Sequence, residues 1–178
     1  KMQKIALNNL INTNTHPDIL VGGELSNQLS TTSSNLSNKN ISFLGLYSAC
    51  ATFIQGLIIL GNLIDSKQIK TGINITSAHN LASERQFRYP IEYGAPKPEY
   101  STFTTTGCVG TFLSSEMKGV KILNGTIGSV IDYGVKDAYN MGAVMAPAGR
   151  QQPPVLPPNR RDCSHKPPSV FPAVLPML

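Results

Sequence analysis

Charged residues are scarce in this chain. Only 14% of the 178 residues are Asp, Glu, Lys or Arg, whereas 40% are hydrophobic. A composition of this kind favours a folded domain over a disordered chain. The formal net charge is +5, but no block of Lys and Arg with interleaved aromatic residues occurs in the sequence. Such blocks mark nucleic-acid interfaces, so we expect no nucleic acid among the partners.

Cysteine is also scarce. The three cysteines, Cys50, Cys108 and Cys163, show neither a disulfide framework nor the spacing of a metal site. An odd number of cysteines without such spacing favours a reducing compartment. The sequence accordingly predicts no metal site and no bound cofactor.

Long hydrophobic runs are missing as well. The longest apolar stretch, residues 49–64, is interrupted by polar residues and glycines. A helix that crosses a bilayer needs about 20 apolar residues, so this stretch predicts a buried helix instead. We expect neither a transmembrane segment nor a signal peptide.

What the sequence does contain is an alternation of short apolar runs and helical patterns. The runs that predict strands are residues 18–23, 41–47, 69–77 and 102–113. The patterns that predict helices are residues 1–11, 28–39, 49–65 and 135–145. Residues 120–133 predict another strand or strand pair, and the prolines of residues 79–100 oppose regular structure there. The alternation predicts an α/β layered domain with a largely parallel sheet.

The composition changes near Pro147. Most of the 13 prolines lie from Pro147 onward, and no isoleucine lies beyond Ile131. A proline-rich segment without apolar periodicity cannot build a core, so we expect residues 148–178 to be extended or disordered. Residues 1–147 are expected to form the folded part. The abrupt change also suggests a different coding origin for the tail, such as a frameshift; a natural linker and a polyproline II ligand are the alternatives.

Two stretches resemble a known family. Residues 47–54, Tyr-Ser-Ala-Cys-Ala-Thr-Phe-Ile, resemble the strand-to-helix turn of thiolases and β-ketoacyl synthases, in which the nucleophilic cysteine opens a buried helix. Residues 77–94, together with residues 130–134 and 140–147, resemble the SpoVAD family of thiolase-fold sporulation proteins. The resemblance implies a thiolase-like layered fold of which most of the N-terminal half is present, incomplete at both ends.

That resemblance also implies a function. The family implies binding of dipicolinic acid, free or as its calcium chelate, without catalysis, for uptake into the developing spore. The implied partners are other stage V sporulation proteins of a membrane channel complex, and a second copy of the chain in a homodimer. The implied location is cytoplasmic or peripheral at the inner spore membrane. The alternatives are acyl transfer of the thiolase or ketoacyl-synthase type through Cys50, and an inactive truncated product.

Five residues are candidates for the ligand site. Cys50 stands where a helix begins, and a helix N-terminus lowers the pKa of a thiol. Glu24 and His79 each follow an expected strand, at the sheet edge where open α/β folds bind ligands. Arg85 and Arg88 offer guanidinium groups that suit carboxylates. The alternatives are a small buried Cys50, a helix-start role for Glu24, and a solvated or dimer-contacting arginine loop.

A catalytic triad is not visible in the sequence. Nucleophilic catalysis by Cys50 needs a base within about 3 Å of the thiol. Of the three histidines in the chain, only His79 follows an expected strand. His16 lies beside Pro17, and His165 lies in the proline-rich tail. We therefore expect a binding protein rather than an enzyme.

Overall fold

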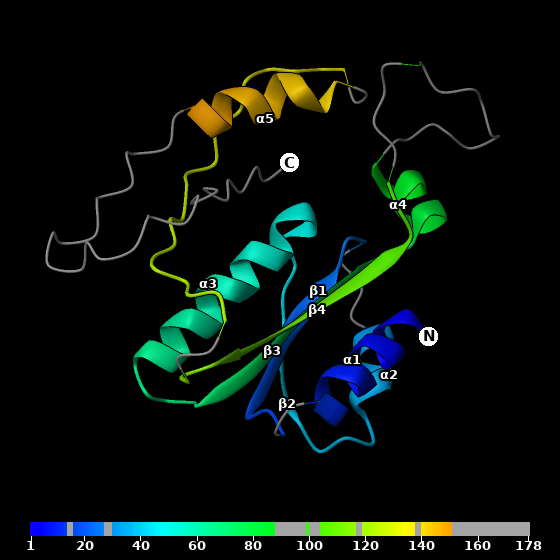
Figure 1. Ribbon diagram of the computed structural model, residues 1–178. Coiled ribbons are helices and arrows are strands. Elements are labelled where there is room, and N and C mark those ends of the chain that lie inside the picture. Colours follow the sequence, from blue (N-terminus) through cyan, green and yellow to red (C-terminus); the bar gives the residue numbers. More distant parts are fainter. Residues whose placement is uncertain are drawn as a thin grey trace, which may run out of the picture.

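The computed structural model describes residues 1–13, 16–26, 30–87, 99, 104–116, 119–137 and 140–150 (Figure 1). The helices and strands follow in this order: α1 (Met2–Thr13), β1 (Ile19–Glu24), α2 (Ser30–Leu36), β2 (Ser42–Gly45), the 3-10 turn η1 (Ala49–Ala51), α3 (Thr52–Asp65), β3 (Thr71–Ala78), α4 (Asn80–Phe87), β4 (Gly107–Ser114) and α5 (Met141–Arg150).

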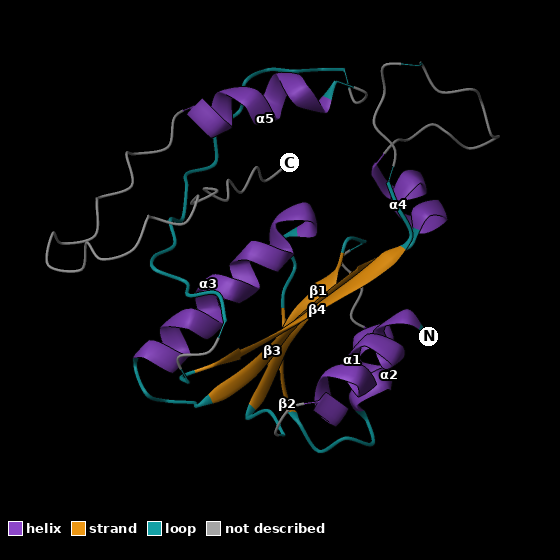
Figure 2. Ribbon diagram, viewed as in Figure 1, coloured by secondary structure: helices purple, strands orange, loops and turns teal. Residues whose placement is uncertain are grey.

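The four strands form one sheet in the order β2-β1-β3-β4. Strand β1 pairs in parallel with both β2 and β3, whereas β4 runs antiparallel to β3. Helix α3 covers one face of the sheet, and α1 and α2 cover the other (Figure 2). The expected α/β class with a largely parallel sheet is therefore confirmed.

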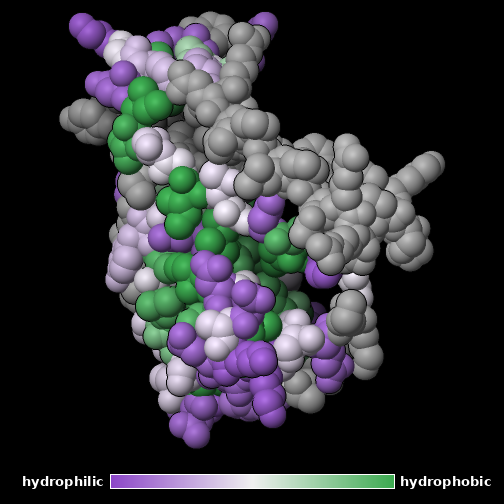
Figure 3. Space-filling view, turned by 90° about the vertical axis from the view of Figure 1, so that its left-hand side faces the viewer, coloured by the Kyte–Doolittle hydropathy of each residue, from purple (hydrophilic) through white to green (hydrophobic). Residues whose placement is uncertain are grey.

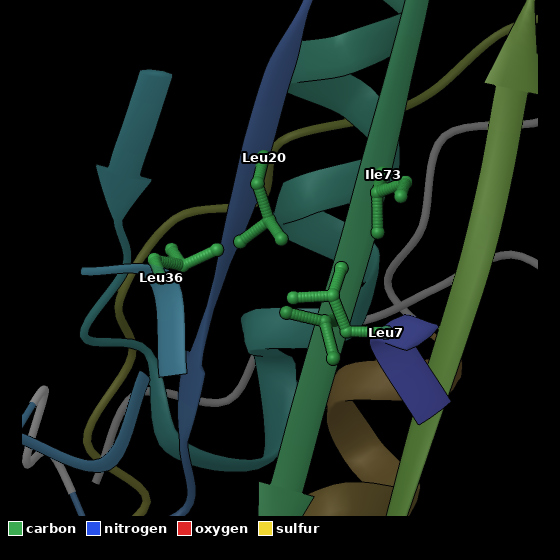
Figure 4. Close-up of a cluster of buried hydrophobic side chains, with 5 residues drawn as sticks. Leu7, Leu20, Leu36 and Ile73 are labelled. Carbon is green, nitrogen blue, oxygen red and sulfur yellow. The ribbon is translucent and has the colours of Figure 1, made fainter. Parts of the chain in front are cut away.

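Each face of the sheet has its own core, because successive strand residues point to opposite sides. On the side of α1 and α2, one cluster joins Leu7, Leu20, Leu36 and Ile73, from two helices and two strands (Figure 4). On the side of α3, a second cluster contains Val21, Leu46, Leu60 and Leu113. Leu20 and Val21 are neighbours in β1, and each is completely buried on its own side.

A buried polar network also ties the elements of the α1 and α2 face together. The side chain of Gln3 in α1 is 2% exposed. Its amide donates to Thr32 Oγ1 of α2 at 3.0 Å and to Ser77 Oγ of β3 at 2.9 Å. Its carbonyl oxygen accepts from Asn35 Nδ2 at 3.3 Å. Buried polar groups need such partners, so this network fixes how both helices sit on the strand.

Helix α3 fits its face of the sheet through residues of complementary size. Its buried residues are Thr52, Gly56 and Leu60, which lie four positions apart on one helix face. A Cβ atom added to Gly23 would lie 3.4 Å from Thr52 Cγ2, and one added to Gly72 would lie 2.6 Å from Leu60 Cδ2. Thr52 and Leu60 thus stand over strand glycines, and this pattern sets the position of α3 along the strands.

Several boundaries differ from the sequence-based expectations. Residues 120–133 form no strand, which makes that prediction wrong. Helix α4 occupies the start of the stretch that its prolines predicted to be irregular, because residues 80–87 contain no proline. Strand β4 begins at Gly107 rather than near residue 102. Helix α5 begins later than expected and continues past Pro147 to Arg150, and residues 151–178 lie outside the described residues.

Residues 119–137 run without helix or strand, and many of their apolar side chains face solvent. Val120, Ile127 and Val130 are 95%, 76% and 68% exposed. A Cβ atom at Gly125 would lie 2.7 Å from Ile58 Cγ1, so the segment passes directly over the outer side of α3. Figure 3 views this side of the molecule, where hydrophobic residues gather between more polar ends.

Candidate functional site

The carboxyl ends of the three parallel strands bring predicted site residues to one edge of the sheet. Glu24 is the last residue of β1, Cys50 lies in η1 after β2, and His79 directly follows β3. Arg85 lies in the last turn of α4, which continues from β3 at the same end of the molecule (Figure 1). This edge is where open α/β sheets place their ligands. No hydrogen bond joins any two of these four side chains within the described part of the chain.

The turn that carries Cys50 is held by its neighbours. The backbone N–H of Ser48 donates to Thr52 Oγ1 at 3.2 Å, and the Ser48 hydroxyl bonds to Gln55 Oε1. The N–H of Ala51 donates to the Ser48 carbonyl at 2.8 Å. Ala49 has a φ of 44°, in the left-handed region that residues with a Cβ atom rarely adopt. The turn thus enters α3 through one strained residue and a set of local hydrogen bonds.

Cys50 is exposed at the start of this helix, two residues before α3 begins. Within the described residues, its thiol makes no hydrogen bond and no ion pair. His79 is exposed as well. The arrangement presents a thiol to solvent at a helix N-terminus, where the backbone N–H groups favour negative charge.

Glu24 lies at the same edge but on the other face of the sheet. Its neighbour Gly23 faces Thr52 of α3, so the alternation of β1 turns Glu24 towards α1 and α2. Glu24 is level with Ser77 of β3, whose hydroxyl belongs to the network of Gln3. The side chain is half-buried, and its Oε1 atom is buried without a hydrogen-bond partner among the described residues. Glu24 and the turn of Cys50 therefore lie at the same edge but on opposite faces of the sheet.

The two arginines differ in what the structure describes. Arg85 is exposed on α4, whereas Arg88 lies outside the described residues. Helix α4 is anchored to the chain before β4: Asn80 Nδ2 donates to the Thr104 carbonyl at 2.6 Å. Glu84 Oε1 accepts from the Thr104 N–H at 2.7 Å and from its hydroxyl at 2.8 Å. This anchor holds α4, and with it Arg85, at the edge of the sheet.

Asn74 is a residue that the sequence-based predictions omitted. It lies in the middle of β3, is completely buried, and faces α3 beside Gly56. Its Nδ2 atom donates to the carbonyl of Phe53, in the first turn of α3, at 2.7 Å. The signal was present in the sequence: an amide side chain between two isoleucines of an expected buried strand is unusual.

Cys108 lies half-buried at the margin of the core on the side of α1 and α2. It lies on β4 level with Ser77 and packs against the cluster of Leu7 and Leu20. Burial raises the pKa of the Cys108 thiol to about 11. The thiol therefore stays protonated at neutral pH, unlike a reactive cysteine.

Across the described ranges, no group of three or more His, Cys, Asp or Glu residues is placed to hold a metal ion. Among the helices that the structure describes, none has the length and apolar character needed to cross a membrane.

Comparisons with known proteins identify relatives. The stage V sporulation protein AD (SpoVAD) family matches residues 1–152. The stage V sporulation protein AD of Bacillus subtilis (strain 168) is 38% identical over 131 residues, which cover 74% of this chain and 39% of that protein. This chain thus spans about two fifths of the length of that relative.

Among solved structures, 3-oxoacyl-[acyl-carrier-protein] synthase III from Aquifex aeolicus VF5 is similar with a TM-score of 0.41 and 14% sequence identity. The similarity covers 57% of this chain and 32% of the synthase. The family match extends over most of the present sequence and includes every described helix and strand. The chain belongs to the stage V sporulation protein AD family.

Proposed function

We propose that this chain serves sporulation by binding dipicolinic acid, and that it does so without catalysing a reaction. Membership of the stage V sporulation protein AD family is the observation that carries the proposal, and it supports the sporulation role directly. Dipicolinic acid is the ligand class that the sequence resemblance implies. The ligand is a small aromatic dianion, so the site must supply positive charge and a flat contact surface.

The ligand would bind at the carboxyl edge of β1, β2 and β3. Two sources of positive potential favour a dianion there: the N-terminus of α3 and the exposed Arg85. Arg88 follows Arg85 by three residues in the sequence and would add a third positive charge. Cys50 and His79 add polar groups at the same edge. A ligand that lies across the strand ends would reach the turn of Cys50 on one side and the side of Glu24 on the other.

Calcium would explain the presence of Glu24 in such a site. A carboxylate repels a dianion unless it is protonated or a cation lies between the two. Calcium prefers oxygen ligands and often takes a carboxylate together with ligand oxygens. The Oε1 atom of Glu24 is buried and has no hydrogen-bond partner in the described part of the chain, so a calcium ion that reached it would pair an oxygen that is otherwise unpaired.

The wider setting follows from the same family. We propose that the protein acts with other stage V sporulation proteins of a membrane channel complex, from the cytoplasm or from the surface of the inner spore membrane. A homodimer belongs to the same proposal. Co-purification of the chain with these proteins from sporulating cells would test it, and a chain recovered alone and monomeric would contradict it.

Calorimetric titration of the full chain with dipicolinate, with and without calcium, tests the proposed ligand. Isophthalate is the matched control, because it carries the same two carboxylates on a ring that lacks the nitrogen atom. We expect dipicolinate to bind more tightly than isophthalate, and calcium to strengthen dipicolinate binding. Absence of dipicolinate binding under both conditions would overturn the proposal.

Two variants locate the site at the sheet edge. Arg88→Ala should weaken binding by about 1.5–3 kcal/mol if a charged hydrogen-bond set is lost. Glu24→Gln should reduce the calcium dependence, because an amide binds calcium less strongly than a carboxylate. Lys70→Ala is the control, since Lys70 is exposed at the opposite edge, just before β3. Unchanged binding in both site variants would move the site away from this edge.

Acyl transfer through Cys50 is the second candidate function. The observation in its favour is the exposed thiol at the start of α3. Incubation with an acyl-CoA followed by intact-mass measurement distinguishes the two functions. A stable thioester that is lost in Cys50→Ser would favour the enzyme, whereas an unchanged mass favours the binding protein.

A further inference from the structure

A side-chain hydrogen bond joins the centre of the sheet to the first turn of α3. We call this contact, from Asn74 of β3 to Phe53 of α3, the latch. Asn74 is 0% exposed, and its Nδ2 atom donates to the carbonyl of Phe53 at 2.7 Å. Its Oδ1 atom is buried and has no hydrogen-bond partner among the described residues. A Cβ atom added to Gly56 would lie 2.1 Å from this oxygen, so only glycine lets the helix approach the amide.

An asparagine is an unfavourable choice for mere packing at this position. An aliphatic side chain would fill the same space without leaving a buried acceptor unpaired. What asparagine adds is the donated N–H bond to Phe53. The flanking contacts of α3, Thr52 over Gly23 and Leu60 over Gly72, are apolar or small and can slide more easily than a hydrogen bond.

The position of the latch links it to the proposed ligand site. Phe53 is three residues beyond Cys50, within the first turn of α3. The Ser48 hydroxyl and backbone bond to Gln55 and Thr52 of the same helix, so the turn moves with the helix end. A shift of the first turn of α3 would therefore carry Cys50 with it.

We propose that Asn74 is a positioning residue, which holds the N-terminus of α3 and the Cys50 turn at the carboxyl edge of the sheet. The part of this inference that concerns ligand binding rests on the proposed function. The part that concerns the helix end stands on the contacts of Asn74 alone. A single experiment can separate the two parts.

The test compares Asn74→Leu with Leu7→Ala in the full chain. Leu7 belongs to the core on the opposite face, so its truncation destabilises the fold without touching α3. Hydrogen–deuterium exchange followed by mass spectrometry reports on residues 49–57, and dipicolinate titration reports on the site. In Asn74→Leu we expect exchange in residues 49–57 to rise about three- to tenfold relative to β1, and dipicolinate to bind about three- to tenfold more weakly. In Leu7→Ala we expect neither selective change.

A second test, which applies if Asn74→Leu fails to fold, enlarges Gly56 and then removes the Asn74 side chain that it would contact. Gly56→Ala should raise exchange in residues 49–57, because its methyl group collides with Asn74 Oδ1. In an Asn74→Ala background the same change should have little further effect, since the space is then open. Additive effects of the two substitutions would overturn the latch.

The outcomes separate the latch from the proposed function. Selective loss of protection in residues 49–57 without any dipicolinate binding by the parent chain would support the latch and contradict the ligand. Normal binding by an Asn74→Leu variant with a loosened helix end would show that Asn74 does not position the site. Unchanged exchange in Asn74→Leu would remove the inference altogether.

Discussion

Two apolar, isoleucine-rich stretches of this chain have opposite fates. The first stretch, residues 69–77, contains most of the interior strand β3, in which Ile73 is completely buried. Residues 120–133 form no strand, and Ile127 is 76% exposed. Both stretches carry the β-branched residues that favour strands. Their composition therefore does not explain the difference.

Neighbouring strands explain it better. Strand β3 pairs with β1 on one side and β4 on the other, and it is covered by helices on both faces. The segment of residues 119–137 meets the outer side of α3 at Gly125 and extends no strand of the sheet. A strand needs a partner edge and a face to bury, and strand propensity alone does not replace them.

The largest expected effect separates these two isoleucines. Ile73→Ala should lower the free energy of unfolding by about 2–5 kcal/mol, because it leaves a cavity in the core. Ile127→Ala should change it by less than about 0.5 kcal/mol, as for other exposed positions. Urea unfolding followed by circular dichroism measures both. Equal losses in the two variants would mean that residues 119–137 are packed in solution, which would break the comparison.

The sequence predicted most of the sheet body for a physical reason. Apolar runs that end in glycine, such as Val21-Gly22-Gly23, have few stable conformations other than a buried strand. The expected strand over residues 120–133 failed because nothing in a local pattern says whether an edge is available for pairing. The start of β4 was misplaced for a related reason: Thr104 and Thr106 have strand propensity but bond to α4 instead.

The candidate site was predictable only as far as the sheet edge. The order of strands and turns placed Glu24, Cys50 and His79 at the ends of three strands. This order fixes the edge of the sheet but not the face on which each side chain lies. The face of the sheet on which each side chain lies depends on where the strand ends, because a shift of one residue moves the side chain to the opposite face. Asn74 could not be assigned a partner from the sequence, because its bond to Phe53 depends on how far α3 lies along the sheet.

The next effect concerns the polar network of the sheet body. Gln3→Ala should lower the free energy of unfolding by about 1–3 kcal/mol, because Thr32 and Ser77 lose a buried partner. Asn124→Ala is the control in the exposed segment and should change little. Chemical unfolding of both variants measures the difference. A neutral Gln3→Ala variant would show that α1 does not depend on this network.

A smaller effect is expected at the link between β2 and α3. Ala49→Gly should raise the free energy of unfolding by about 0.5–1 kcal/mol, since glycine adopts a positive φ without the cost that alanine carries. Ala51→Gly is the control, because the buried Ala51 has a φ of −85° and gains nothing from glycine. Thermal unfolding of the two variants would show opposite signs. A loss of stability in Ala49→Gly would contradict strain at this turn.

The smallest effect concerns the opposite, amino end of the sheet. Asp18 Oδ2 accepts from the backbone N–H groups of Lys70 at 2.8 Å and Thr71 at 2.9 Å, and so ties the start of β1 to the start of β3. The N–H groups of Thr71 and Lys70 favour the ionised form and lower the pKa of Asp18 below its ordinary value of 3.8.

Because the folded pKa of Asp18 is the lower one, its contribution to stability is present above about pH 4 and is lost as the pH falls through the folded pKa. The carboxylate is exposed, so the contribution should be about 0.5 kcal/mol or less. The parent should therefore lose slightly more stability than Asp18→Asn between pH 5 and pH 3. Asp132 is the matched control in the exposed segment, where Oδ1 accepts the N–H of Gly134, two residues away, at 2.7 Å. Asp132→Asn should follow the parent over this range, and an Asp18→Asn curve that also follows the parent would show that this tie adds nothing to the sheet.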